Sequence, residues 1–401
     1  MILTTPAPER YTRFSCPNPH CAQCNRPGTD NIAHRSWTGT ARHIERLRCP
    51  LCHREFSARE GTLIARSKLP EATVVQLLTC QRWGGCDEGT ADICAVALKP
   101  VHRFQRVAAH RAHTHQQQAV PQVDVTGVQM DEAHSKLRRR RTEWIHTAWA
   151  MGRGFLLWGD CGPRTQDTAA TLRAQVVARV QTLPLFLTDG GKASPAALLQ
   201  VVGVVYRRRR RGHVGRKPKP RVVAPTDLFY AQGVKVRDKT GQVVEVSRRV
   251  VCGGPRQFGK QLRMRQLGET IQTACMERGY GTLRGLVAAL RRRTRWLSWS
   301  RTRHRGKVWL MMSLYNFVLP HKSLRQGRTR RTPAMAIGLT THVWSYREYL
   351  WLPVHPDPVL TQQMDERIAR LLTPALQDLP SGRTPAPPPV AQEAAPLPNA
   401  A

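Results

Sequence analysis

An apolar run at residues 183–191, LPLFLTDGG, ends in an acidic residue and two glycines. Its continuous apolar character predicts a buried strand. An aspartate at the end of such a strand, followed by flexible glycines, can point its carboxylate into a cleft. Asp189 is therefore a candidate functional acid. For any single acid in this chain, the competing interpretation is a salt bridge to a nearby arginine.

The residues on either side of this run predict the rest of a sheet. Residues 123–131, VDVTGVQMD, alternate between apolar and polar as a half-buried strand does, and they end in Asp131-Glu132. Further elements are predicted at four places: strands at 144–151 and 155–158, which complete an antiparallel meander, and helices at 167–180 and 270–294. The last of these helices carries Glu277 in its first half. Three separate elements thus each supply an acid in an α+β fold.

The charge of the chain points to a polyanionic partner. Among 401 residues, 63 are Lys or Arg and 27 are Asp or Glu, which gives a formal net charge of +36. So large a positive charge repels itself unless a polyanion neutralises it, which argues against an ordinary metabolic enzyme. Nucleic acid is the default partner. An acidic membrane surface competes, but there is no lipidation signal and no apolar stretch long enough to cross a membrane.

The cysteines predict a metal site rather than disulfides. Residues 1–11, MILTTPAPERY, lack the apolar core of an export signal, so we expect a reducing cytoplasm and association with the nucleoid. The 11 cysteines are then poor disulfide candidates, and clusters among them suggest a metal. The apolar fraction of 41% is enough for folded cores.

Five of these cysteines lie between residues 14 and 66, where we predict a zinc ribbon. Cys49 and Cys52 form a CxxC knuckle, which can point two thiolates at one ion. The earlier cluster offers either Cys16 with Cys21 or Cys21 with Cys24. Since Zn²⁺ takes four ligands, one thiol of the five is spare, and His20 and His53 are possible substitutes. The competing interpretation is a set of scattered reduced cysteines.

Residues 69–116 predict three helices arranged as a helix-turn-helix. The first opens at Leu69-Pro70-Glu71 and ends at Gly84-Gly85, and the second fits residues 88–96. The third, residues 101–115, carries four basic side chains that we assign to one face: Arg103, Arg106, His110 and Arg111. A basic third helix is typical of one that enters the major groove of DNA. The competing interpretation is a solvated helical linker.

The remaining basic runs lie beside the predicted sheet. Residues 206–221, YRRRRRGHVGRKPKPR, hold too few apolar residues to fold alone and are a candidate clamp for the DNA backbone or a solvated loop. They open an expected insertion at about 206–265, which includes a hairpin of two strands at 229–236 and 243–251. Residues 374–401 are rich in Pro and Ala and predict a disordered tail.

Several segments together carry a resemblance to a known family. The N-terminal ones are the two cysteine clusters with the string from Arg48 to Thr62, and the central ones are Asp131-Glu132, Leu187-Thr-Asp189-Gly190 and Met276-Glu277-Arg278. The most distinctive are Asn316-Phe317 with Pro320-His321-Lys-Ser-Leu324, and the string from Thr332 to Ser345. From about residue 14 to 352, the chain resembles insertion-sequence transposases of the DDE superfamily, close to the IS-one-like group.

The resemblance implies an RNase H-like catalytic domain at residues 121–352. Its first Asp, on the first strand, matches Asp131, its second, at the end of the fourth strand, matches Asp189, and its Glu, on a later helix, matches Glu277. Such a site holds two Mg²⁺ (or Mn²⁺) ions, cuts a phosphodiester bond and transfers the 3′-OH strand into target DNA. Glu132 and Glu269 are alternative ligands. The family pattern selects Cys16, Cys21, Cys49 and Cys52 for zinc, because Cys24 stands where an aromatic residue is usual.

Double-stranded DNA is the implied partner, bound by a homodimer or larger assembly. The side chains expected to contact it are Arg103, Arg106, Arg111, Arg138, Arg139, Arg140, Arg207, Arg208, Arg209, Arg284, Arg291 and His321. One departure is the order Glu277-Arg278-Gly279-Tyr280-Gly281, in which Tyr280 stands in the place of a usual Asn. Tyr280 favours an alternative function, a catalytically inactive DNA-binding protein. A second alternative is a structure-specific nuclease such as a resolvase.

Overall fold

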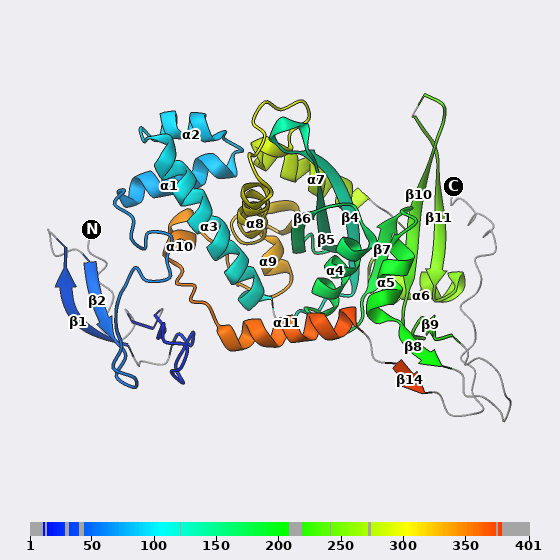
Figure 1. The fold of residues 1–401 in the computed structure, drawn as a ribbon, viewed down its shortest axis with the longest axis horizontal. Coiled ribbons are helices and arrows are strands. Elements are labelled where there is room, and N and C mark those ends of the chain that lie inside the picture. Colours follow the sequence, from blue (N-terminus) through cyan, green and yellow to red (C-terminus); the bar gives the residue numbers. More distant parts are fainter. Residues whose placement is uncertain are drawn as a thin grey trace.

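The computed structural model describes residues 11–12, 14–28, 32–39, 44–120, 122–207, 219–240, 242–271, 274–373 and 376–378. The described chain is a mixed α/β structure built around a six-stranded mixed sheet. Figure 1 shows a small N-terminal sheet at one end, three helices beside it, and the large sheet beyond them. The small sheet contains β1 (Ala33–Thr38), β2 (Ile44–Arg48) and β3 (Glu55–Ser57), and the three helices are α1 (Glu71–Arg82), α2 (Asp87–Ile93) and α3 (Leu98–Ala119).

The central sheet has the strand order β11-β10-β7-β4-β5-β6. Its strands are β4 (Gly127–Lys136), β5 (Thr142–Ala150), β6 (Leu156–Gly162), β7 (Leu185–Asp189), β10 (Tyr230–Arg237) and β11 (Val243–Cys252). The antiparallel meander predicted from the sequence is confirmed by β4, β5 and β6. The strand predicted around LPLFL is β7, which lies between β4 and β10 and is parallel to both.

Helices cover both faces of this sheet. One face carries α4 (Gln166–Val177) and α5 (Ser194–Val202), and the opposite face carries α6 (Pro255–Met264), α7 (Ala274–Leu286) and α8 (Arg301–Phe317). Side chains alternate along β4 accordingly. Val128 and Met130 belong to the core shared with α4, while Ala133 packs in a cluster with α7 and α8. Because Asp131 has the parity of Ala133, it lies on the face that α7 covers.

The expected insertion at about 206–265 differs from the structure. β10 lies within it, yet pairs in parallel with β7, so this segment contributes a strand to the central sheet. The hairpin predicted there is confirmed as β10 and β11. A separate small sheet joins three further strands: β8 (Val204–Arg207), β9 (Arg221–Val223) and β14 (Leu376–Asp378). β14 falls in the tail predicted as disordered, so that prediction is wrong for these three residues, and the rest of the tail lies outside the described residues.

The C-terminal part of the described chain returns to the N-terminal modules. Its elements are β12 (His321–Gln326), β13 (Thr329–Arg331), α9 (Pro333–Ala336), α10 (Tyr346–Trp351) and α11 (Pro358–Leu372), and two short 3-10 turns are η1 (Arg138–Arg140) and η2 (Ala288–Leu290). The backbone N–H of Leu63 donates to the carbonyl of Leu350, and that of Val354 donates to Gly61. α11 packs on α4 and α5, as Figure 1 shows along the lower edge of the molecule.

Candidate functional site

Strand register brings the first two candidate acids together. β4 pairs in parallel with β7, and Met130 is level with Thr188. The next residue on each strand is an aspartate, so Asp131 and Asp189 are neighbours on adjacent strands, on the same face of the sheet. This placement follows from the two apolar strands, because each buries its side chains up to the residue before the acid.

The third acid is brought to the same place by helix α7. Tyr280 is buried on the sheet side of this helix, and its hydroxyl donates to the backbone carbonyl of Asp131 at 2.7 Å. The same hydroxyl accepts a hydrogen bond from Thr147 at 2.8 Å. Glu277 lies three residues, or about one turn, before Tyr280 on the same helix. The phenol therefore fixes α7, and with it Glu277, against the strand that carries Asp131.

Gly279 allows this helix to approach the sheet closely. A Cβ added to it would lie 2.7 Å from the indole ring of Trp149. Trp149 is fully buried, and its Nε1 donates to Thr147 at 2.9 Å, so the ring is held in place. Only a glycine lets the helix backbone pass at this distance. Gly279 and Tyr280 thus both serve the packing of α7 against the sheet.

All three candidate acids line one pocket with a volume of about 400 Å³. The other residues around it are Arg164, Gly190, Gly191, Gly233, Val234, Lys235 and Met276. Glu277 forms an ion pair with Lys235 of β10, and Arg164 approaches Asp189 at 4.0 Å. The pocket therefore contains three carboxyl groups, with the basic side chains of Arg164 and Lys235 beside them.

Burial and nearby negative charge raise the pKa values of the two aspartates in this pocket. Burial, and then the negative charge of Asp189, raise the pKa of Asp131 to about 7. Burial and the nearby carboxylate of Glu132 raise the pKa of Asp189 as well. Arg164 and Lys235 are close enough to compensate only part of this charge.

The two alternative acids are not part of this pocket, although Glu132 is near enough to Asp189 to raise its pKa. Glu132 follows Asp131 on β4 and therefore points to the opposite face of the sheet, where Arg164 binds it at 3.0 Å. Glu269 is exposed in the segment before α7. Neither of them lines the pocket.

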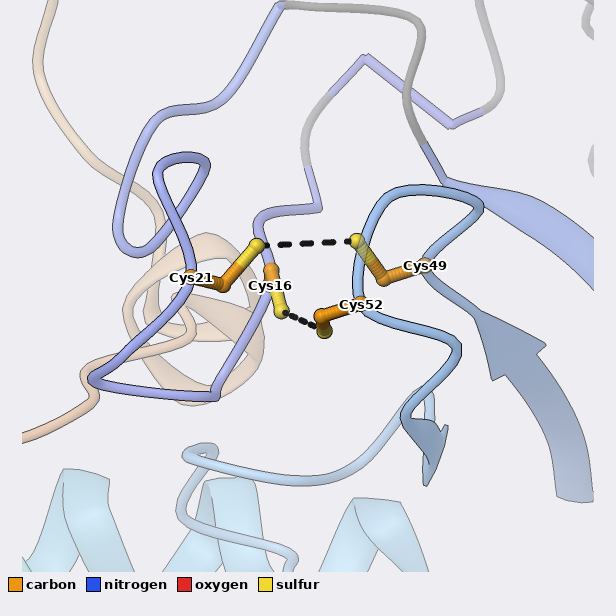
Figure 2. A group of neighbouring side chains, drawn as sticks. All are labelled: Cys16, Cys21, Cys49 and Cys52. Carbon is orange, nitrogen blue, oxygen red and sulfur yellow. Dashed lines mark hydrogen bonds between the residues drawn. The ribbon is translucent and has the colours of Figure 1, made fainter.

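The N-terminal cysteines form a buried cluster that could bind zinc. Figure 2 shows Cys16 and Cys21 facing Cys49 and Cys52 across two loops. The four sulfur atoms lie within 4.8 Å of one another, with Cys16 and Cys52 at 3.5 Å and Cys21 and Cys49 at 3.9 Å. Among the described residues, no other group of three or more His, Cys, Asp or Glu side chains brings its potential ligand atoms this close. Four thiols at this separation fit one tetrahedral ion.

The same geometry identifies the spare thiol. Cys24 lies outside the cluster, as predicted, although its backbone forms a bridge with Cys16. Burial raises the pKa of Cys16, and of Cys21. Burial also acts to raise the pKa of Cys52, but hydrogen bonds, first from the backbone of Arg54, outweigh it and lower that pKa to about 6. One thiol of the cluster is thus already disposed to be the thiolate that a metal requires.

The basic face predicted on the third helix needs one correction. Arg103, Arg106 and His110 are exposed on one side of α3. Arg111 is buried. It follows His110 by one residue, which turns its side chain about 100° around the helix axis, onto the face that packs against the rest of the chain. Its guanidinium donates to the backbone carbonyls of Gly61, Tyr349 and Leu352. The prediction that Arg111 contacts DNA is therefore wrong, and this residue joins three segments of the chain.

The other basic residues divide into three groups. Arg138, Arg139 and Arg291 are exposed, and Arg284 is half-buried near the ring of Tyr280. His321 packs its ring against Tyr315, and burial lowers its pKa, which disfavours the charged form. The remaining predictions lie outside the described residues: Arg208 and Arg209 entirely, and Arg140 and Arg207 for their side chains.

Sequence reasoning missed two residues of the pocket. Lys235 comes from β10, which was predicted as part of an insertion, and only the pairing of β10 with β7 places it beside Glu277. Arg164 follows β6 in a loop and gives no signal in the sequence beyond its charge. Both are single basic residues in a chain that has many, so their pattern could not have distinguished them.

Comparison with protein-family models gives no match, and comparison with curated proteins gives no significant match either. Within the part of the chain that the structure describes, no helix has the length and apolar character needed to cross a bilayer.

Proposed function

We propose that the chain is a DNA transposase of the DDE type, which cuts DNA at the ends of a mobile element and joins them to a target. The observation that carries this proposal is the single pocket lined by Asp131, Asp189 and Glu277. Counted from β4, these acids stand on the first strand, at the end of the fourth strand and on a later helix, which is the placement expected of an RNase H-like domain.

The residues of this pocket suit phosphodiester cleavage. The three carboxylates would hold Mg²⁺ or Mn²⁺, which, when bound, activates water and stabilises the leaving 3′ oxygen. Glu277 would exchange its ion pair with Lys235 for a metal ion. Lys235 would then be free to bind a phosphate oxygen next to the scissile bond, and Arg164, which stays paired with Glu132, would add positive charge at the edge of the pocket. The glycines after Asp189 leave space for the DNA backbone at the edge of the sheet.

The N-terminal part would supply the recognition of DNA ends. We assign zinc to the four-cysteine cluster, which lies beside the small sheet formed by β1, β2 and β3. α1, α2 and α3 would form a helix-turn-helix whose exposed stripe contains Arg103, Arg106 and His110. The net charge of +36 supports strong, salt-dependent binding to DNA.

The alternative of an inactive DNA-binding protein rested on Tyr280. Its buried phenol holds α7 against the strand of Asp131, so the residue that favoured this alternative instead contributes to the position of Glu277. Nothing in the pocket now favours loss of activity over activity.

The test is a nicking assay with Mg²⁺ on plasmid DNA that carries the sequences flanking the gene. We expect the parent protein to nick this DNA, and Asp131→Asn, Asp189→Asn and Glu277→Gln to lose the activity by about 100-fold or more. Asp124→Asn is the matched control, because Asp124 is an exposed acid outside the pocket. If the pocket variants nick as well as the parent, the assignment is wrong. Strand transfer into a second plasmid distinguishes a transposase from a resolvase.

A further inference from the structure

A second pocket, with a volume of about 770 Å³, lies at the junction of the three-helix segment and the central sheet. One wall is the loop before α8, which presents Trp296 and Trp299. These tryptophans are 45% and 56% exposed, which is unusual for the largest apolar side chain. Three exposed arginines surround them: Arg138, Arg295 and Arg303. Exposed aromatic rings beside cations suit a ligand that is flat and attached to anionic groups.

The loop that carries these tryptophans is held in position. Ser298, between them, is buried, and its carbonyl accepts from the backbone N–H of Arg138 at 2.9 Å. Its hydroxyl lies 3.2 Å from Nδ1 of His304. The guanidinium of Arg138 stacks over the ring of Trp299 at 3.3 Å from its centroid. The backbone that presents the two indole rings is therefore fixed. Since Arg138 covers one face of Trp299, a base would stack on the other face of this ring or on Trp296, with little ordering of the loop.

The opposite wall excludes a simple phosphate site. It carries Asp87 and Glu88 at the start of α2. Asp87 is compensated, since Lys307 lies 3.0 Å from it and His102 3.4 Å. Glu88 is exposed and would repel a phosphate placed beside it. A neutral group with N–H donors is favoured at this wall, and a nucleobase has such donors along its edge.

We infer that this pocket binds an unpaired nucleotide of DNA, with the base stacked on Trp296 or Trp299 and the neighbouring phosphates held by Arg138, Arg295 and Arg303. The inference rests on the proposed function, since it adds a contact to DNA that the catalytic pocket also holds. Arg138 follows Asp131 by seven residues along and just beyond β4, or roughly 20 Å at about 3.3 Å per residue. The unpaired base is thus several nucleotides from the bond to be cut, and is a different nucleotide from the one at the carboxylates.

The experiment measures binding without any divalent cation, so that no cleavage occurs. Fluorescence anisotropy compares a blunt duplex with the same duplex carrying a single-stranded extension. We expect the parent to bind the extended duplex roughly 10-fold more tightly for each base that stacks. Trp296→Ala with Trp299→Ala should abolish this preference and leave the affinity for the blunt duplex nearly unchanged. Trp296→Phe with Trp299→Phe should restore most of the preference, because a phenyl ring still stacks.

The matched control is Trp83→Ala. Trp83 is also exposed and also lies under an arginine, Arg82, at 3.8 Å, but it is outside the pocket. This variant should keep the preference for the extended duplex. Equal affinity of the parent for the two duplexes, or an unchanged preference in the double alanine variant, would overturn the inference. So would a change in self-association, rather than in DNA preference, when sedimentation of the double variant is compared with that of the parent.

The same measurement separates this inference from the proposed function. Asp189→Asn should keep the preference for the extended duplex, whatever its affinity for either duplex alone, since Asp189 lies outside the tryptophan pocket. If the preference is present and depends on the tryptophans while no nicking occurs, then only the assignment of cleavage fails. If nicking depends on Asp189 but the preference is absent, then only the nucleotide site fails.

Discussion

Helix α7 offers a test of how closely Glu277 is held to the sheet. Gly279 and Gly281 are two residues apart on this helix, and replacing either with alanine improves helix propensity by about 1 kcal/mol. At Gly281 a Cβ meets nothing within 4 Å, whereas at Gly279 it would lie 2.7 Å from Trp149. The difference in stability between the two variants therefore measures the effect of the contact between α7 and Trp149.

The size of the effect follows from these distances. Ordinary contact requires about 3.4 Å, so α7 or the ring of Trp149 must move by about 0.7 Å. Trp149 is fully buried and hydrogen-bonded to Thr147, which leaves the helix as the element that moves. Overpacking of this kind costs about 1–3 kcal/mol. We expect Gly281→Ala to be more stable than the parent, and Gly279→Ala to be less stable than Gly281→Ala by that amount.

Two assays report on the pair. Denaturant unfolding gives the difference in stability, and the nicking assay reports the position of Glu277. Because a misplacement near 1 Å can cost about 100-fold in rate, Gly279→Ala should nick roughly 10- to 100-fold more slowly, while Gly281→Ala should match the parent. Equal stability and equal activity of the two variants would show that α7 does not need a glycine at position 279 to pack against Trp149.

Three further tests use substitutions elsewhere in the chain. Arg111→Ala should lose about 3 kcal/mol or more of unfolding free energy, since it leaves the carbonyls of Tyr349 and Leu352 without their guanidinium donor and removes one of the two donors to the carbonyl of Gly61. Arg106→Ala should keep stability and reduce the salt dependence of DNA binding. Cys49→Ser should lower the zinc bound per chain, measured by metal analysis, and Cys24→Ser should not. Burial lowers the pKa of His304 to about 4, so its neutral form is favoured in the folded state. The free energy of unfolding should therefore be highest above about pH 6.5 and fall by about 3 kcal/mol towards pH 4. His304→Gln should flatten this decline when unfolding is measured across that pH range.

The elements that sequence could predict are those with a local signal. The apolar run before Asp189 and the alternation before Asp131 predict β7 and β4, because the apolar pattern of a strand depends on which of its faces are buried. The CxxC at Cys49 and Cys52 likewise predicts half of the cysteine cluster from local geometry. These features do not depend on any other part of the chain.

The parts that sequence could not predict depend on which segments meet. Arg111 and Arg106 are both basic residues of one helix, and only the packing of α3 shows that one is buried beneath the C-terminal segment. Tyr280 gave no sign of its role, because its partners are the carbonyl of Asp131 and the hydroxyl of Thr147, on two strands far away in sequence. The position of Lys235 beside Glu277 follows only from the pairing of β10 with β7. Each is a long-range contact between residue types that are common in this chain.

The contacts of α3 also bear on how DNA would be held. Its buried face packs against α8, and residues from Leu63 through Phe104 to Leu350 belong to one apolar core that includes strands of the central sheet. Arg111 further ties α3 to the segment after the small sheet and to the end of α10. The three-helix segment is therefore packed firmly against the rest of the described chain. DNA bound along Arg103 and Arg106 would lie at a set distance from the carboxylate pocket, so the position of the cut would be fixed by packing between α3 and α8.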